Sequence, residues 1–283
     1  MGMPARRLIE LAMPYWEAEA EIVRRFFARR PRRDDHIFWL RAQLWKELHP
    51  VDGYFSGLHR ELAKLTDLFP RVDVDVDRHH YHFLLQQMVQ EFNHYVVLAD
   101  ILQYLLSREI SAADTVQLPE EKKLQELRRR YAEGSDVERA AVLLTEGGGA
   151  RMFREGRKIK GGPLERRIAR AMDVIYRDER DHVAEAARAI APLTRSRDDL
   201  RRISEAVRAI SLQRVRMRNE MFRHPMTEDE LDRLISRRSR RAASRESRPR
   251  SRRSGSRSTP ARRWSSGAGP LTATSSTGSA TAG

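Results

Sequence analysis

Residues 88–106 read MVQEFNHYVVLADILQYLL, and this stretch decides the fold. At about 100° per residue, its apolar side chains gather on one side of a helix. The residues on that side are Leu84, Met88, Tyr95, Leu98, Leu102 and Leu105. Glu91 and His94 are three residues apart, so both project from the same side. The pattern predicts a long core helix with a carboxylate that is costly to bury unless it is paired or bound to a metal.

A second pair with this spacing follows 88 residues later, where Glu179 and His182 lie in another long amphipathic segment. The residues on their side are also apolar: Ile168, Met172, Ile175, Tyr176, Val183, Ala186 and Ile190. A single Glu-x-x-His pattern is weak, because it often arises by chance on a solvated surface. Two such pairs on the apolar faces of long helices predict a shared centre of two metal ions inside a helix bundle.

Helical patterns cover nearly all of residues 1–235, and strand patterns are almost absent. Helices are expected at 15–29, 35–48, 52–69, 78–107, 119–132, 136–155, 163–191, 198–222 and 228–236. Arginine-rich runs at 128–130 and in the helix that begins at 198 alternate with acidic and apolar residues, so they are interpreted as solvated faces. The expected fold is all-α, with a four-helix core and extra flanking helices.

The composition excludes several classes of protein. The chain has 283 residues and no cysteine, which excludes disulfide scaffolds, thiolate metal sites and cysteine nucleophiles. No apolar run approaches the roughly 20 residues that cross a bilayer. The start of the chain lacks the apolar stretch of a secretory signal. We therefore expect a cytoplasmic protein that does not enter the membrane.

The net charge of +14 comes mostly from the end of the chain. Residues 236–283 contain twelve arginines and one acid, a net charge of +11, which leaves +3 for residues 1–235. Such a segment has almost nothing to pack, so we expect a disordered tail and one folded domain at 1–235. Clustered arginine attracts phosphate without sequence preference, so a polyanion-binding arm is the alternative to a solvated tail. Apart from this non-specific role of the tail, we expect no nucleic-acid partner.

A metal site in a bundle also needs a carboxylate from each of the two remaining helices. If residues 70–77 join two antiparallel helices, Glu61 and Glu91 reach similar heights, within about two turns at ~1.5 Å per residue. Glu61 also shares its side of the helix with leucines, and it is the first choice. Glu47 is the alternative, although it lies further from the loop.

The fourth carboxylate is expected to be Glu146. It precedes Glu179 by 33 residues, close to the 30 that separate Glu61 from Glu91, as two similar hairpins require. Glycines follow at residues 147–149, and in a regular helix they would cost roughly 3 kcal/mol relative to alanine. Either they form a loosened turn that leaves room beside the metals, or the helix ends at Glu146 and they form its cap and loop.

This arrangement resembles the ferritin-like di-iron carboxylate superfamily over residues 52–191. Members bind two irons in a four-helix bundle through a carboxylate, a Glu-x-x-His, a second carboxylate and a second Glu-x-x-His, in the chain order found here. The metal ligands that the resemblance implies are Glu61, Glu91, His94, Glu146, Glu179 and His182. It also implies that Glu91 and Glu179 bridge the metals and that Asp178 orients His94 by a hydrogen bond.

The superfamily includes ribonucleotide reductase small subunits, desaturases, monooxygenases, rubrerythrins and ferritins, and the resemblance does not select one of them. Absence of cysteine excludes a complete rubrerythrin, and Leu98 stands where reductases carry a tyrosine. The expected function is oxidation of a small organic substrate by dioxygen at two iron ions, with an electron donor and a homodimer as further possibilities. Manganese, or an iron and manganese pair, is compatible with the same ligands.

Two alternatives remain at the sequence level. The first is a ferroxidase or iron-handling protein that has the same metals and no organic substrate. The second is a helical interaction protein in which the glutamates and histidines form ordinary interhelical pairs. A cavity that reaches the metals would separate the first alternative, and metal analysis would separate the second.

Overall fold

A computed structural model describes residues 3–49, 58–190 and 192–246. Every regular element in this part of the chain is a helix, apart from an isolated bridge between Val72 and Val76. The all-α prediction is therefore confirmed. None of these helices is long and apolar enough to span a bilayer.

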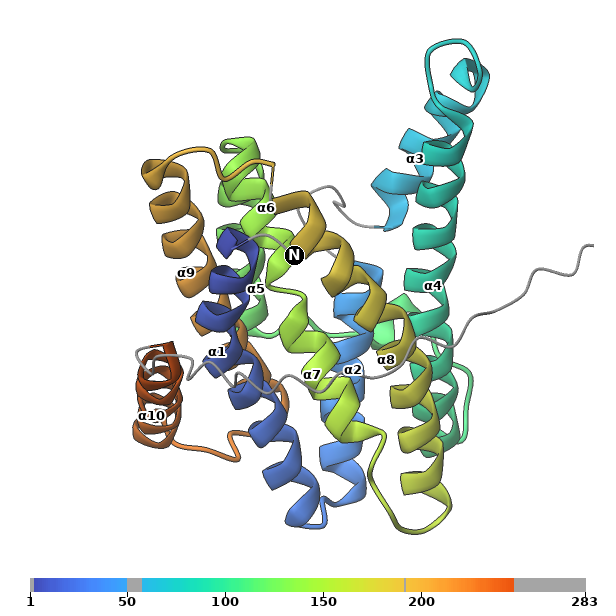
Figure 1. The fold of residues 1–283 in the computed structure, drawn as a ribbon. Helices are drawn as coiled ribbons and strands as arrows, with labels where there is room; N and C mark the ends of the chain where they lie inside the picture. The colour runs from blue at the N-terminus through green and yellow to red at the C-terminus, as the bar shows by residue number, and fades with distance from the viewer. Residues whose placement is uncertain (1–2, 50–57, 191, 247–283) are drawn as a thin grey trace, which may run out of the picture. The chain divides into compact units, whose positions relative to one another are not determined.

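The order of the elements follows the expected punctuation of the sequence (Figure 1). The α-helices are α1 (Met3–Ala28), α2 (Arg33–Leu48), α3 (Leu58–Leu68), α4 (Arg78–Leu106), α5 (Pro119–Ala132), α6 (Asp136–Leu144), α7 (Gly147–Gly156), α8 (Pro163–Ile190), α9 (Arg197–Met221) and α10 (Glu228–Glu246). Two single 3₁₀ turns lie at Phe69–Arg71 and Ala112–Asp114. Ser135 caps α6, where its hydroxyl accepts from the Glu138 amide and the Glu138 carboxylate accepts from the Ser135 amide.

Helix α1 begins at Met3, well before the expected start at Tyr15, and it continues through Pro14. A proline inside a helix costs about 3 kcal/mol. Leu8, Ala12 and Trp16 recur every fourth residue and are all buried, so the core contacts of this face offset that cost.

Contacts between the helices show which of them can bring the candidate ligands together. Helix α4 contacts α2, α3 and α8, whereas α8 also contacts α6 and α7. Helix α1 packs against α7, α9 and α10, and α9 closes on α5 and α6. The side chains of α2, α4, α7 and α8 can therefore meet in one interior region.

Aromatic packing fixes α1, α2 and α9 to each other. The Trp39 ring of α2 is fully buried and stacks on Phe222, just past the end of α9, with ring centroids 5.6 Å apart. Phe26 of α1 lies 5.0 Å from the same Phe222 ring. Aromatic pairs of this kind stabilise the fold by more than their buried area alone. They therefore hold these helices in place relative to one another.

The last described helix, α10, runs to Glu246 and so extends beyond the expected start of the tail at Ser236. Among the side chains of α10 that the structure describes, the last buried apolar one is Ile235, where the apolar pattern of the sequence also ends. Beyond that point Ser239 bonds to the Ile235 carbonyl, and Arg238 forms an ion pair with Glu17 of α1. Residues 247–283 of the expected tail, and 50–57 near the start of the expected core, lie outside the described residues.

Candidate metal centre

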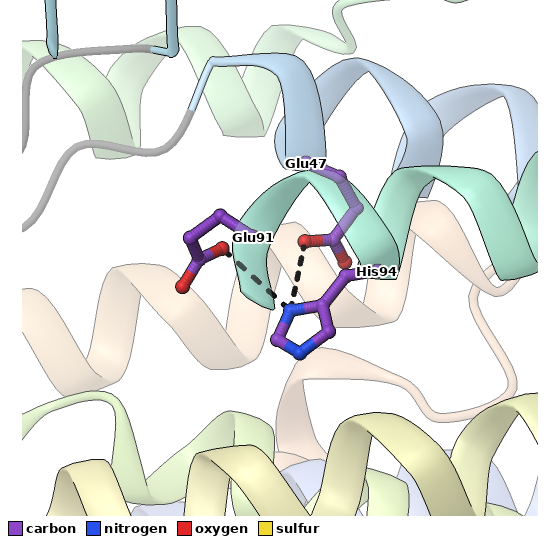
Figure 2. A group of neighbouring side chains, drawn as sticks. All are labelled: Glu47, Glu91 and His94. Atoms are coloured by element: carbon purple, nitrogen blue, oxygen red, sulfur yellow. Dashed lines mark ion pairs between the residues drawn. The ribbon is translucent and has the colours of Figure 1, made fainter. Parts of the chain in front are cut away.

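Three potential metal ligands converge where α2 packs against α4. One carboxylate oxygen of Glu47, one of Glu91 and a ring nitrogen of His94 all lie within 4.8 Å of one another. His94 Nδ1 is 3.6 Å from Glu91 Oε2 and 3.9 Å from Glu47 Oε2, and Figure 2 shows both carboxylates directed at this nitrogen. These separations are too long for hydrogen bonds. His94 is fully enclosed and Glu47 is buried, whereas the Glu91 side chain is 15% exposed.

The imidazole of His94 is oriented from α8. Its Nε2 lies 3.1 Å from Asp178 Oδ2, and Asp178 is the residue that the superfamily resemblance paired with it. A carboxylate at this nitrogen holds the proton on Nε2, so Nδ1 can act as a ligand. In the described part of the chain Nδ1 is buried without a hydrogen-bond partner. Such an orphaned atom in a native interior requires an explanation, and a bound cation supplies one.

The carboxylate of Glu47 is held by a relay from α9. Gln43, one turn earlier on α2, donates from Nε2 to Glu47 Oε1. The Gln43 Oε1 atom accepts a hydrogen bond of 2.5 Å from Arg218 Nη1. All three side chains are buried. Because the Arg218 guanidinium can only donate, the Gln43 amide must turn its oxygen toward Arg218 and its nitrogen toward Glu47. Glu47 is therefore positioned directly by Gln43 and, through Gln43, by Arg218.

Charge crowding shifts the pKa values of this group. Burial lowers the pKa of His94, but the Asp178 hydrogen bond and the carboxylates of Glu91 and Glu47 outweigh it and raise the pKa well above its ordinary value. Burial raises the pKa of Glu47, and Glu91 adds to the rise against the opposing charge of His94. A metal cation favours the deprotonated form of every ligand, so metal binding would release protons here.

A third carboxylate, Glu179, faces the same region from α8. It is buried, and its Oε2 atom has no hydrogen-bond partner among the described residues. Burial raises the pKa of Glu179 well above its usual range, and the charges of Glu146 and Glu91 raise it further. The carboxylates of Glu47, Glu91 and Glu146 all act electrostatically on Glu179. Repulsion among four negative charges is unfavourable unless cations lie close to them.

Glu146 lies at the break between α6 and α7. Arg128 of α5 donates from Nη2 to its Oε1, and Arg214 Nη1 of α9 lies 3.4 Å from its Oε2. Behind this group Glu19 of α1 accepts from Arg214 Nε at 3.2 Å and from Arg218 Nε at 3.3 Å. Arginines and glutamates thus form a buried network on one side of the centre.

The burial of these arginines corrects one sequence interpretation. Arg128, Arg214 and Arg218 are 2%, 1% and 1% exposed, so they do not belong to solvated faces. Arg214 and Arg218 are one turn apart, and they share a helix face with the buried Val207, Ile210 and Met221. That shared face is the signal by which the sequence could have revealed them.

The glycines after Glu146 form the first turn of α7, so the hypothesis that they form a cap and loop is wrong. Helix α6 ends at Leu144, and the chain turns before α7 starts. A β-carbon on Gly147 would overlap the Trp16 ring, and one on Gly148 would overlap the Glu19 carboxylate. The glycines therefore allow α7 and α1 to approach closely beside the centre.

Among the described residues, Glu61 does not belong to the group formed by the three clustered ligands. Glu61 lies on α3, buried, with its carboxylate 3.5 Å from Lys64 Nζ. The Tyr81 hydroxyl donates to the Leu65 carbonyl at 3.0 Å, so these two residues are level on the antiparallel helices. Counting from that contact puts Glu61 about six residues, or ~9 Å, short of Glu91 along α4. Glu47, the alternative from the sequence, occupies that position instead.

The last candidate ligand, His182, follows Glu179 on α8, but its side chain lies outside the described residues. Of the other candidates, Glu91 and His94 are grouped directly, Glu179 lies within electrostatic range of both, and Glu146 lies within electrostatic range of Glu179. Comparisons with models of known protein families, with curated proteins and with solved structures gave no match. Its own geometry is therefore the basis for interpreting this centre.

Proposed function

We propose that this chain is a non-haem di-iron protein that uses dioxygen to oxidise a small organic substrate within a ferritin-like helix bundle. The observation that carries the proposal is the convergence of Glu47, Glu91 and His94 on one buried point, where Nδ1 of His94 lacks a hydrogen-bond partner among the described residues. The donor set of carboxylates and imidazole suits iron or manganese.

The surrounding residues fit such a centre. The metals would be held by Glu47, Glu91 and His94 together with Glu146 and Glu179, and Asp178 would keep the imidazole oriented. When bound, iron would supply one-electron redox chemistry and open positions for dioxygen. One turn away on the two long helices, Leu98 and Ile175 are fully buried, so apolar walls limit the entry of water.

The overall reaction balances with an external electron donor. Insertion of one oxygen atom into a C–H bond forms a hydroxyl group, and the second oxygen atom leaves as water. That reaction consumes two electrons and two protons besides those of the substrate. Asp178, 24% exposed at its side chain, lies between the buried imidazole and solvent, so it offers a path for protons to the centre.

Anaerobic loading with Fe(II) tests the proposal directly. After removal of unbound metal, the purified chain should retain about one iron or more, and air should oxidise this iron. Further dioxygen uptake should then require a reductant and an organic substrate. Retention of much less than one iron would overturn the proposal in favour of a helical interaction protein.

A ferroxidase is the second candidate, because the same carboxylates and imidazole would bind Fe(II) without an organic substrate. It gives a different result in the same experiment. A ferroxidase oxidises Fe(II) added well beyond the amount that its sites hold, and it needs no reductant. An oxidase stops when its bound iron is oxidised. The ratio of dioxygen consumed to Fe(II) added therefore separates the two functions.

A further inference from the structure

We propose that the two halves of this centre bind metal in order, with Arg214 and Arg128 delaying the second half. The first half consists of Glu47, Glu91 and His94, and the second contains Glu146 and Glu179. This inference rests on the proposed function, because it requires that the centre binds metal.

The first half carries no charge-assisted hydrogen bond from an arginine among the described residues, although the charge of Lys46 acts on Glu47. In the described part of the chain, the ion pairs of Glu47 and Glu91 are made with His94 and with no lysine or arginine. An incoming metal ion therefore breaks no hydrogen bond from a described arginine or lysine at these three side chains. Nδ1 of His94 already points at both carboxylates, so the three ligands are arranged to hold an ion.

The second half is already compensated. Glu146 accepts from Arg128 through one oxygen and from Arg214 through the other. Both guanidinium groups are almost fully buried, so neither can swing into solvent when a metal ion arrives. To become a ligand, Glu146 must give up at least one buried, charge-assisted hydrogen bond.

Arg214 also approaches Glu179. A β-carbon placed on Gly149 would lie 3.4 Å from Arg214 Nη2 and 3.7 Å from Glu179 Oε2. Neither of these two buried atoms has a hydrogen-bond partner in the described part of the chain. A positive group and a carboxylate therefore face the same small region beside Gly149, and a cation bound there is repelled by the guanidinium at short range.

The relative affinities follow from this difference. The first metal ion neutralises uncompensated carboxylates, whereas the second one displaces or approaches buried arginines. Binding at the second half should be weaker by at least about tenfold. Arg214 acts here as a positioning residue, since it controls when Glu146 is available and does not itself bind metal.

Titration of the full chain with Co(II) under equilibrium dialysis, with visible absorption as a second readout, tests the order. The wild-type chain should show two steps separated by at least about tenfold in dissociation constant. Glu146→Gln should remove the second step and keep the first. Glu47→Gln should weaken the first step. If Glu146→Gln weakened both steps equally, the order would be refuted.

Arg214→Met tests the cause. This change leaves Glu19 paired with Arg218 and Glu146 paired with Arg128, so each buried carboxylate keeps one arginine. The second step should tighten toward the first, whereas Arg214→Lys, which keeps the charge, should preserve the gap. An unchanged gap in the methionine variant would overturn the role of Arg214.

The titration also distinguishes this inference from the proposed function. Two steps of equal affinity in the wild-type chain would overturn the inference and leave a dimetal centre intact. Absence of Co(II) and Fe(II) binding would overturn both. If Arg214→Met fails to fold, the Glu146→Gln and Glu47→Gln comparison still decides the order of binding.

Discussion

Asp178 and His94 are 84 residues apart in the sequence, yet Asp178 Oδ2 lies 3.1 Å from His94 Nε2. This contact joins α8 to α4 and sets the direction in which the other ring nitrogen points. Because that nitrogen faces Glu47 and Glu91, the contact determines whether the three ligands converge on one position.

Asp178→Asn should weaken metal binding by about 10- to 100-fold, since an amide holds the ligand tautomer of His94 less well than a carboxylate. Asp173→Asn is the matched control, because Asp173 lies on the same helix and contacts only Arg157 and Arg177 in the described part of the chain. Competition with a coloured chelator measures both affinities. Equal affinities in the two variants would exclude an orienting role for Asp178.

Glu47→Gln and Glu61→Gln should differ in metal binding. Both carboxylates are 5% exposed, so the two changes remove similar buried charges. Only Glu47 belongs to the convergent group, and its loss should lower the iron retained after gel filtration. Glu61→Gln should retain the wild-type amount. The reverse result would restore the assignment that the sequence favoured.

Gly148→Ala should destabilise the protein although alanine is the better helix former. The added methyl group meets the Glu19 carboxylate, so either this carboxylate leaves its two arginines or α7 moves away from α1, at a cost of about 1–3 kcal/mol. Gly149→Ala meets only ordinary contacts and should gain up to about 1 kcal/mol from helix propensity. Urea unfolding of the two variants compares them. Similar midpoints would show that α7 and α1 do not require the close approach.

Glu19→Gln should cost about 3–5 kcal/mol in unfolding free energy, because it removes a carboxylate shared by two buried arginines. Glu21→Gln, on the same helix, breaks only partly exposed pairs with Arg24 and Arg25 and should cost less than about 1 kcal/mol. Thermal unfolding provides the readout. A small effect at Glu19 would mean that the network adds little stability.

Helix α10 provides a test of the domain boundary. Leu231 is 2% exposed, and Leu231→Ala should cost about 2–5 kcal/mol. Asp232→Ala, on the exposed side, should change stability by less than about 0.5 kcal/mol. A chain that ends at Glu246 should unfold at the wild-type temperature, because it keeps all of α10, which packs against α1. Early melting of that chain would contradict the boundary.

The sequence was most informative where local spacing sets the geometry. Helical periodicity placed Glu91 beside His94 and identified the apolar side of each long helix, because both depend only on residues three or four apart. The hydrogen bond between Asp178 and His94 was anticipated through the superfamily resemblance, and no local pattern indicates it.

The sequence was least informative where the site depends on how helices align. The choice between Glu61 and Glu47 depends on how far along α4 each residue lies. The sequence matches the heights of Glu61 and Glu91 only within about two turns, and this uncertainty is larger than the 4.8 Å within which the ligand atoms gather. The interpretation of the α9 arginines as a solvated face is wrong for a related reason. An arginine on an apolar face is buried only if a carboxylate from another helix meets it, and Glu19 lies 195 residues before Arg214.

The relay from Arg218 through Gln43 to Glu47 has a consequence for biosynthesis. Glu47 is made early and Arg218 late, so a nascent chain on the ribosome carries the acidic ligand long before the residue that orients it. Until translation has passed α9, Glu47 lacks this support. If the centre binds metal as proposed, the finished protein, rather than the growing chain, would therefore be the form that selects an ion from the cell.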